Sequence, residues 1–128
     1  MEEKINYWTD LSNYDYETGL AMLTSKRYLY VGFMCHQTIE KIFKAFYCKQ
    51  KNDIPPLTHS LSYLAKKGEF YDLFDETQKD FIDQIEPLNI EARYPSYKER
   101  LLKSLSESKC TELLNETKKL QEWIKLRL

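Results

Sequence analysis

The chain has 128 residues, of which 42% are hydrophobic and 30% are charged, and its formal net charge is -1. This size and composition predict one globular domain over residues 1–128 and exclude a disordered chain, and three glycines with four prolines are too few for the frequent turns of a β-sandwich. The charge excludes a global basic field, so any RNA binding has to come from a local patch.

The amino-terminal sequence and the cysteines indicate the compartment. MEEKINYWTD is acidic and lacks the basic and apolar regions of a signal peptide. No apolar run approaches the roughly 20 residues of a membrane span. The cysteines are odd in number and have no CxxC spacing, which favours reduced core thiols over a disulfide framework (Cys35, Cys48 and Cys110). We therefore expect a cytoplasmic protein that does not enter a membrane.

A first helix is predicted over Tyr7–Thr24, because residues at helical spacing form one stripe (Trp8, Leu11, Asp15, Thr18 and Met22, with Tyr14 and Ala21 beside it). Asp15 is the unusual member of this stripe. Either the stripe is tilted and leaves the carboxylate in water, or Asp15 forms an ion pair with Lys41 or Lys44 of the next helix.

A second helix is predicted from Arg27 to about Lys49. It is apolar over so much of its circumference that we expect it at the centre of the domain, with neighbours on more than one side. Polar side chains are nevertheless spaced three and four residues apart and gather on one side (Gln37, Glu40, Lys41 and Lys44).

Residues 50–56 contain Pro55-Pro56 and are predicted to be a loop within the single domain. Thr58 is then the expected N-cap of a short helix over His59–Lys67, with Gly68 as its C-cap.

A fourth helix is expected to start at Asp75, which forms a capping box with Gln78. Pro87 either ends this helix near Glu86 or kinks it before it resumes as far as Arg93. Loop residues 96–104 precede a last helix over Ser106–Leu126. The whole pattern predicts an all-α fold, an up-and-down bundle of four long helices with one short helix.

Four segments in this order resemble the HEPN domains, named for higher eukaryotic and prokaryotic nucleotide-binding proteins. Trp8 and Asp15 resemble the family's opening pattern, and residues 36–45 are similar to its Q-x-x-E-K-x-x-K-A core. Residues 58–61 resemble its T-H-x-L motif, and residues 91–95 resemble its ARYP segment. The chain is thus identified as HEPN-like from about Trp8 to Trp123.

The resemblance implies a homodimer that commonly faces another helical domain or a small nucleotidyltransferase partner, in a toxin–antitoxin or defence system. Many members are metal-independent endoribonucleases with an arginine followed four to six residues later by histidine. Such chemistry is sensible because imidazole moves a proton at the 2′-hydroxyl while guanidinium holds the phosphate. Here no histidine follows Arg93, and the two histidines, His36 and His59, lie upstream. The usual ribonuclease motif is therefore absent.

Two functions remain open, beside a purely structural bundle whose polar cluster only fixes helix register. The first is a nucleotide- or RNA-binding module, or nucleotidyltransferase partner, with phosphate contacts from one set of residues (Lys41, Lys44, Arg93 and Tyr94) and polar support from another (Asp15, Gln37 and Glu40). The second is a metal-independent endoribonuclease in which Arg93 and His59 form a composite catalytic site. Neither function calls for a cofactor, and the spacing of the histidines and carboxylates gives no metal site.

Each of these residues also has a structural interpretation. Arg93 is either a phosphate clamp or a partner in an ion pair with Glu40 or Asp15, and the two lysines either bind phosphate or lie on an ion-paired face. Tyr94 is typical of a core or rim aromatic residue. The resemblance to HEPN domains implies a further candidate, Tyr97, as an acceptor for nucleotide transfer. His59 either completes the site or bonds to a neighbouring helix, and His36 is expected at a packed position or an interface.

Overall fold

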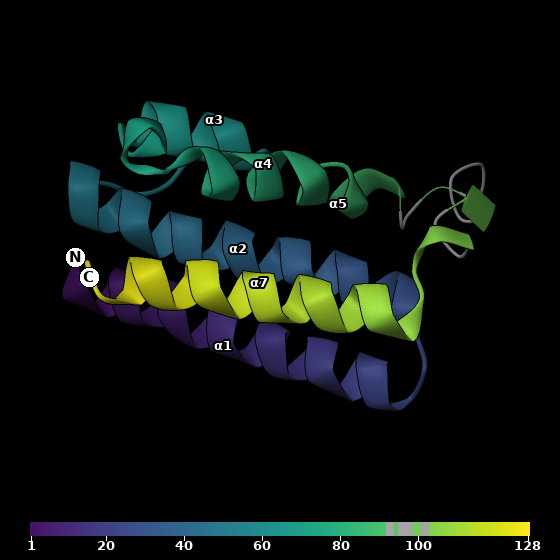
Figure 1. The fold of residues 1–128 in the computed structure, drawn as a ribbon. Coiled ribbons are helices and arrows are strands. Elements are labelled where there is room, and N and C mark those ends of the chain that lie inside the picture. Colours follow the sequence, from purple (N-terminus) through teal and green to yellow (C-terminus); the bar gives the residue numbers. More distant parts are fainter. Residues whose placement is uncertain (92–93, 95–98, 101–102) are drawn as a thin grey trace.

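Three long helices lie side by side, and a layer of shorter helices covers one of them (Figure 1). The structure is a computed structural model of the chain, and the described residues are 1–91, 94, 99–100 and 103–128. The long helices are α1 (Glu2–Thr24), α2 (Tyr28–Lys51) and α7 (Glu107–Lys125). The covering layer contains α3 (Leu61–Lys67), the 3₁₀ helix η1 (Tyr71–Leu73), α4 (Glu76–Ile85) and α5 (Leu88–Glu91). None of the described residues is in a β-strand, and the predicted all-α bundle is confirmed.

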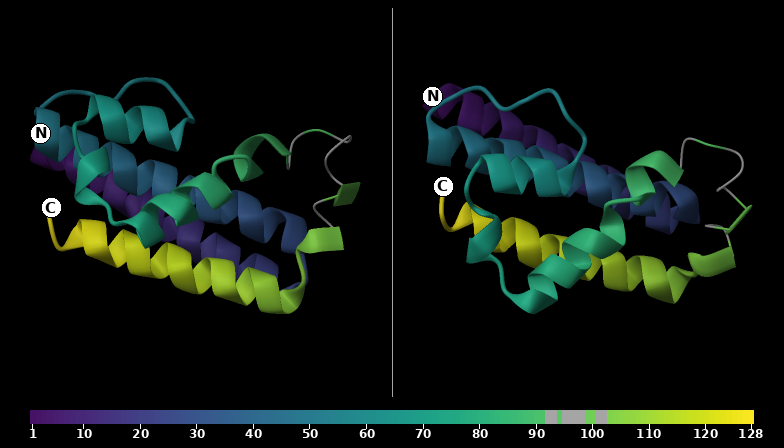
Figure 2. Two further views of the ribbon diagram at one scale, coloured as in Figure 1. Left: turned by 45° about the horizontal axis from the view of Figure 1, so that its top comes forward. Right: turned by 90° about the horizontal axis from the view of Figure 1, so that it is seen from above.

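Helix α2 lies at the centre, with α1 and α7 on one side and the shorter helices on the other (Figures 1 and 2). From Cys35 to Cys48 every side chain except that of Lys41 is buried. A helix buried around its circumference needs neighbours on several sides, as the sequence predicted. The polar side chains of α2 are therefore inside the bundle, where each of them needs a partner.

Helix α1 begins at Glu2, five residues before the predicted start at Tyr7. The acidic Glu2 and Glu3 suit the positive end of the helix dipole, and Ile5 packs against the core. These additional residues lengthen the helix at its amino-terminal end.

The buried line of α1 runs through small residues that hydropathy does not single out. Ser12 and Gly19 are its two buried residues, whereas Tyr14 is 69% exposed. The Ser12 hydroxyl donates a 2.7 Å hydrogen bond to the Thr38 carbonyl oxygen, and a Cβ at Gly19 would lie 3.1 Å from Leu114 Cδ2. Close approach of α1 to its neighbours thus depends on these small side chains.

The short third helix starts later than predicted, which corrects the assignment of Thr58 as its N-cap. The cap is Ser60, whose hydroxyl accepts a hydrogen bond from the Tyr63 amide. The Thr58 hydroxyl instead accepts from the Ser60 amide at 3.1 Å. His59 consequently precedes the helix and belongs to the loop that leads into it.

Gly68 follows α3 as predicted, but the structure requires glycine there because a side chain would collide with its neighbours. Its φ is -76°, an ordinary value, and the left-handed residue is Glu69, with φ 62°. A Cβ at Gly68 would lie 2.5 Å from Phe70 Cε1 and 2.9 Å from the Leu64 carbonyl oxygen. The missing side chain therefore lets the Phe70 ring fold back against the end of α3.

Replacement of Gly68 by alanine is expected to lower the free energy of unfolding by about 1–3 kcal/mol, because the Phe70 ring must move out of its site. Urea denaturation measures this loss. The neighbouring variant Glu69→Gly is the control, since glycine adopts the left-handed conformation without strain. An equal loss in both variants would contradict the steric explanation.

The fourth and last helices follow the sequence signals closely. Asp75 caps α4 in a capping box with Gln78, and α7 begins directly after its N-cap Ser106. At Pro87 the structure combines parts of both predicted outcomes: α4 ends at Ile85, close to Glu86, and a separate short helix, α5, follows from Leu88 to Glu91. The predicted end at Arg93 lies outside the described residues. The fourth helix of the bundle therefore consists of two short pieces.

An aromatic group joins the covering layer to the central helix. The Phe70 ring lies 5.4 Å from the Phe43 ring and 4.6 Å from the Phe46 ring of α2, centroid to centroid. Phe74 stacks on Phe43 at 5.5 Å and contacts Trp123 of α7 at 5.3 Å. We call these five residues the aromatic core.

The three cysteines are buried and unpaired, as expected for reduced core thiols. Burial raises the pKa of Cys35 to about 12, so the thiol stays protonated at neutral pH. Among the described helices none is long and apolar enough to cross a membrane.

Candidate functional site

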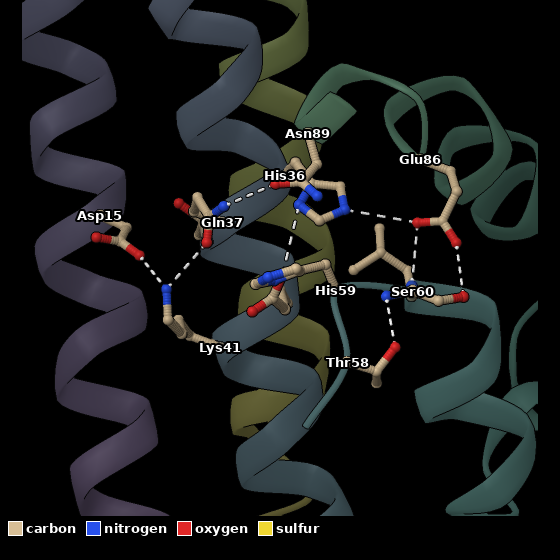
Figure 3. Close-up of polar contacts among 12 residues, drawn as sticks. Asp15, His36, Gln37, Lys41, Thr58, His59, Ser60, Glu86 and Asn89 are labelled. Atoms are coloured by element: carbon tan, nitrogen blue, oxygen red, sulfur yellow. Dashed lines mark hydrogen bonds and ion pairs between the residues drawn. The ribbon is translucent and has the colours of Figure 1, made fainter. Parts of the chain in front are cut away.

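A buried carboxylate, Glu40, lies at the centre of a polar cluster on α2. Figure 3 shows two of its neighbours, His36 and His59. Its Oε2 atom accepts a 3.1 Å hydrogen bond from Lys44 Nζ, and its Oε1 atom lies 3.0 Å from His59 Nδ1. His36 Nδ1 lies 3.8 Å from the same Oε1 atom. We call these four residues together with Glu86 the Glu40 cluster.

The pair with Lys44 explains how a carboxylate is tolerated inside the bundle. Both side chains are buried, and a lone charge there would cost several kcal/mol. Lys44 Nζ also lies 5.0 Å from the centre of the Trp8 ring, a cation–π contact with α1. Lys44 is thus satisfied by two neighbours from within the chain.

His59 is the solvent-facing member of the Glu40 cluster, with 60% of its side chain exposed. A carboxylate only accepts hydrogen bonds, so Nδ1 carries the proton that it donates to Glu40. In the neutral ring Nε2 therefore has a lone pair, and the hydrogen bond described for His59 is made by Nδ1. A buried carboxylate therefore fixes the tautomer and the orientation of an exposed imidazole.

Glu86, at the end of α4, holds the start of α3. Its oxygens accept hydrogen bonds from the amides of Leu61 (3.0 Å) and Ser62 (3.3 Å) and from the Ser60 hydroxyl (3.2 Å) (Figure 3). Partial burial works against the charged form, but His36 and the two amides outweigh it and lower the pKa of Glu86 below its ordinary value. The ionised carboxylate thus anchors the segment that follows His59.

Replacement of Glu86 by glutamine is expected to reduce the free energy of unfolding at pH 7 by about 1–3 kcal/mol. Because the pKa of Glu86 is lower in the folded than in the unfolded chain, its contribution is complete above the ordinary value of 4.5 and is lost as the pH falls through the folded value. Denaturant unfolding at a series of pH values measures the gap between the two proteins. A gap that stays constant between pH 7 and pH 3 would contradict this role.

A separate series of hydrogen bonds crosses the bundle beside the Glu40 cluster. Lys41 Nζ donates to Asp15 Oδ2 of α1 at 3.0 Å and to Gln37 Oε1 at 3.1 Å. The Gln37 amide in turn donates to Asn89 Oδ1 of α5 at 3.1 Å. Of the two alternatives for Asp15, the structure therefore has the ion pair with Lys41.

Most of the predicted site residues come together in these two groups. The structure joins six of them through direct contacts (Asp15, Gln37, Glu40, Lys41, Lys44 and His59). Tyr94 lies beyond the end of α5 and is 54% exposed. Arg93 and Tyr97 lie outside the described residues.

Both predicted phosphate-binding lysines are paired with carboxylates, which matches the ion-paired interpretation of that face. The sequence did not identify Glu86 and Asn89 as members of the site. The sequence signal that could have identified them is their place on either side of Pro87, where the fourth helix is interrupted. Among the described residues no group of three or more His, Cys, Asp or Glu side chains is placed to hold a metal ion.

Comparisons with known proteins agree with this fold. The HEPN domain profile matches residues 5–127, and the chain therefore belongs to the HEPN domain family. The crystal structure of TT1696 from Thermus thermophilus is similar over 98% of each chain, with a TM-score of 0.83 and 15% sequence identity. At this identity the likeness shows the fold alone, and the comparison with curated proteins gave no match. Family membership links the chain to nucleotide- and RNA-related functions in general.

Proposed function

We propose that this HEPN domain binds a nucleotide or RNA on the face that presents His59. The observation that carries the proposal is the exposed imidazole whose Nδ1 is bonded to the buried Glu40 at 3.0 Å. A fixed imidazole donates to a phosphate oxygen when protonated and accepts from a ribose hydroxyl when neutral. It therefore suits a ligand that carries both groups.

The other predicted residues enter this proposal in two ways. Arg93 and Tyr94 belong to the family-like ARYP segment and are proposed to contact phosphate. Lys41 and Lys44 are largely buried and already paired, so a phosphate has to compete with Asp15 or Glu40 for them. We assign them chiefly to holding the site in shape, together with Gln37.

Calorimetry with ATP and with a short single-stranded RNA tests the proposal. The unsubstituted protein is expected to release or absorb heat, and His59→Gln is expected to bind about tenfold or more weakly, the value of a charge-assisted hydrogen bond. Lys119→Ala, on the exposed face of α7, is the matched surface control. Absence of binding at high concentrations of both ligands would refute the proposal.

The pair of His59 and Glu40 also favours a second candidate function, that of a metal-independent endoribonuclease. His59 Nε2 takes the proton of the 2′-hydroxyl, and the 2′-oxygen attacks phosphorus. The bond to the 5′-oxygen breaks, this oxygen takes a proton from water, and the products are a 2′,3′-cyclic phosphate and a 5′-hydroxyl. Arg93 is the proposed partner for the phosphate charge.

RNA incubated with purified protein in EDTA distinguishes this reaction from binding. Cleavage by the unsubstituted protein, lost in both His59→Ala and Arg93→Ala, is the expected result for the enzyme. No cleavage leaves the binding module alone, and cleavage that survives both substitutions indicates a contaminating nuclease.

We also propose that the domain forms a homodimer and works with a small nucleotidyltransferase in a toxin–antitoxin or defence system. The support for this assignment is family membership. Sedimentation at micromolar concentration tests the dimer, which a monomer would refute. A nucleotidyltransferase gene beside this one is the expected genomic context, and its absence counts against that partner.

A further inference from the structure

His36 is enclosed in the bundle between two carboxylates. Its side chain is fully buried, and within the described part of the chain neither ring nitrogen has a hydrogen bond of standard geometry. Instead Nδ1 lies 3.8 Å from Glu40 Oε1, and Nε2 lies 3.5 Å from Glu86 Oε2 (Figure 3). Each nitrogen thus faces an acceptor at ion-pair distance.

We infer that His36 is a positively charged positioning residue, whose imidazolium bridges Glu40 and Glu86 and so holds the segment that carries His59. A neutral imidazole has one N–H group and one lone pair, so one of its nitrogens would direct a lone pair at a carboxylate oxygen. The imidazolium carries a proton on both nitrogens. Only this form suits an acceptor on each side of the ring.

The balance of charge around the ring points the same way. The facing groups are Glu40 on α2 itself and Glu86 from the end of α4. Lys44 contacts the other oxygen of Glu40, Oε2, whereas His59 contacts Oε1, the oxygen that also faces His36. The buried Glu40, the partly buried Glu86 and one ammonium group leave one net negative charge around the ring. A charged His36 balances it, which lowers the cost of burying the carboxylates.

The two carboxylates hold both ends of the same short segment. Glu40 accepts from His59, and Glu86 accepts from the amides of Leu61 and Ser62. Since His36 lies between the two carboxylates, a positive charge on its ring attracts both of them. It thereby holds residues 59–62, which these carboxylates bind. The inference rests on the proposed function only in the importance given to His59.

Nitrogen NMR of the labelled protein tests the charge directly. The chain has two histidines, so the exposed variant His59→Gln leaves only the His36 signals. Both ring nitrogens of His36 are expected to resonate as protonated nitrogens at pH 7. A spectrum with one protonated and one unprotonated ring nitrogen would overturn the inference. The measurement requires no ligand.

Hydrogen exchange tests the positioning. In His36→Gln the Leu61 and Ser62 amides are expected to exchange about tenfold faster relative to the core amides of α7, because Glu86 loses its partner. Ser12→Ala, which removes a buried hydrogen bond on α1, is the matched control and is expected to leave this ratio unchanged. An unchanged ratio in His36→Gln refutes positioning, whether or not the protein binds RNA.

Discussion

Replacement of Glu40 by alanine is expected to lower the free energy of unfolding by roughly 3–5 kcal/mol. The substitution leaves the ammonium group of Lys44 buried without its carboxylate, although it keeps the cation–π contact with the Trp8 ring. It also removes the acceptor for His59. The loss comes chiefly from the uncompensated charge and much less from the value of the ion pair itself.

Urea unfolding of single and double variants separates these contributions. The double variant Glu40→Leu/Lys44→Met removes both charges and is expected to recover most of the stability, because apolar residues of similar volume replace a buried pair at little cost. The exposed pair of Glu116 and Lys119 is the control, and its loss is expected to cost less than about 1 kcal/mol. A Glu40→Ala protein within about 1 kcal/mol of the unsubstituted one would contradict the buried-pair assignment.

Replacement of Phe70 by alanine is expected to cost a similar amount, roughly 3–5 kcal/mol. The Phe70 ring is fully buried and contacts three other rings of the aromatic core. Its removal leaves a cavity between α2 and the covering layer that the rigid neighbours fill only in part. Denaturant unfolding followed by tryptophan fluorescence measures the loss.

Leu73→Ala is the matched control, because Leu73 lies three residues away in η1 and is exposed. Its substitution is expected to change stability by about 0.5 kcal/mol or less. Equal effects at the two positions would refute the role given to the aromatic core. Since this core fixes the covering layer on α2, its loss is also expected to loosen the contact between His59 and Glu40.

The aromatic core and the Glu40 cluster use the same central helix for different purposes. Phe43 and Phe46 fix the position of the covering layer, and Glu40 then meets side chains that this layer carries. A carboxylate buried at this position needs partners. Helix periodicity places His36 and Lys44 four residues before and after it, and packing adds His59 from the loop before α3.

The helices were predictable because their signals are local. The apolar residues of α2, the capping box of Asp75 and Gln78 and the N-cap Ser106 each specify structure within a few residues. The predicted start of α3 was wrong because a local signal was present at two neighbouring positions. Thr58 and Ser60 both have capping hydroxyls, and the contacts of Ser60 and Leu61 with Glu86 accompany the later start.

The candidate site was predictable only in part. Spacing on α2 placed Gln37, Glu40, Lys41 and Lys44 together, and the family motif drew attention to His59. The sequence left open whether Asp15 faces water or pairs with a lysine, and it did not connect Glu86 with His59. These contacts join residues up to 52 positions apart, such as Gln37 and Asn89.

By itself, the sequence determined an all-α domain of the HEPN family with a central helix that carries both core and polar residues. Only the tertiary structure decided what the polar residues do: Lys41 pairs with Asp15, the i,i+4 pair of Glu40 and Lys44 is buried, and Glu40 orients His59. The physical reason is that helix periodicity acts over three or four residues. The partner of a buried charge is chosen by how whole helices pack.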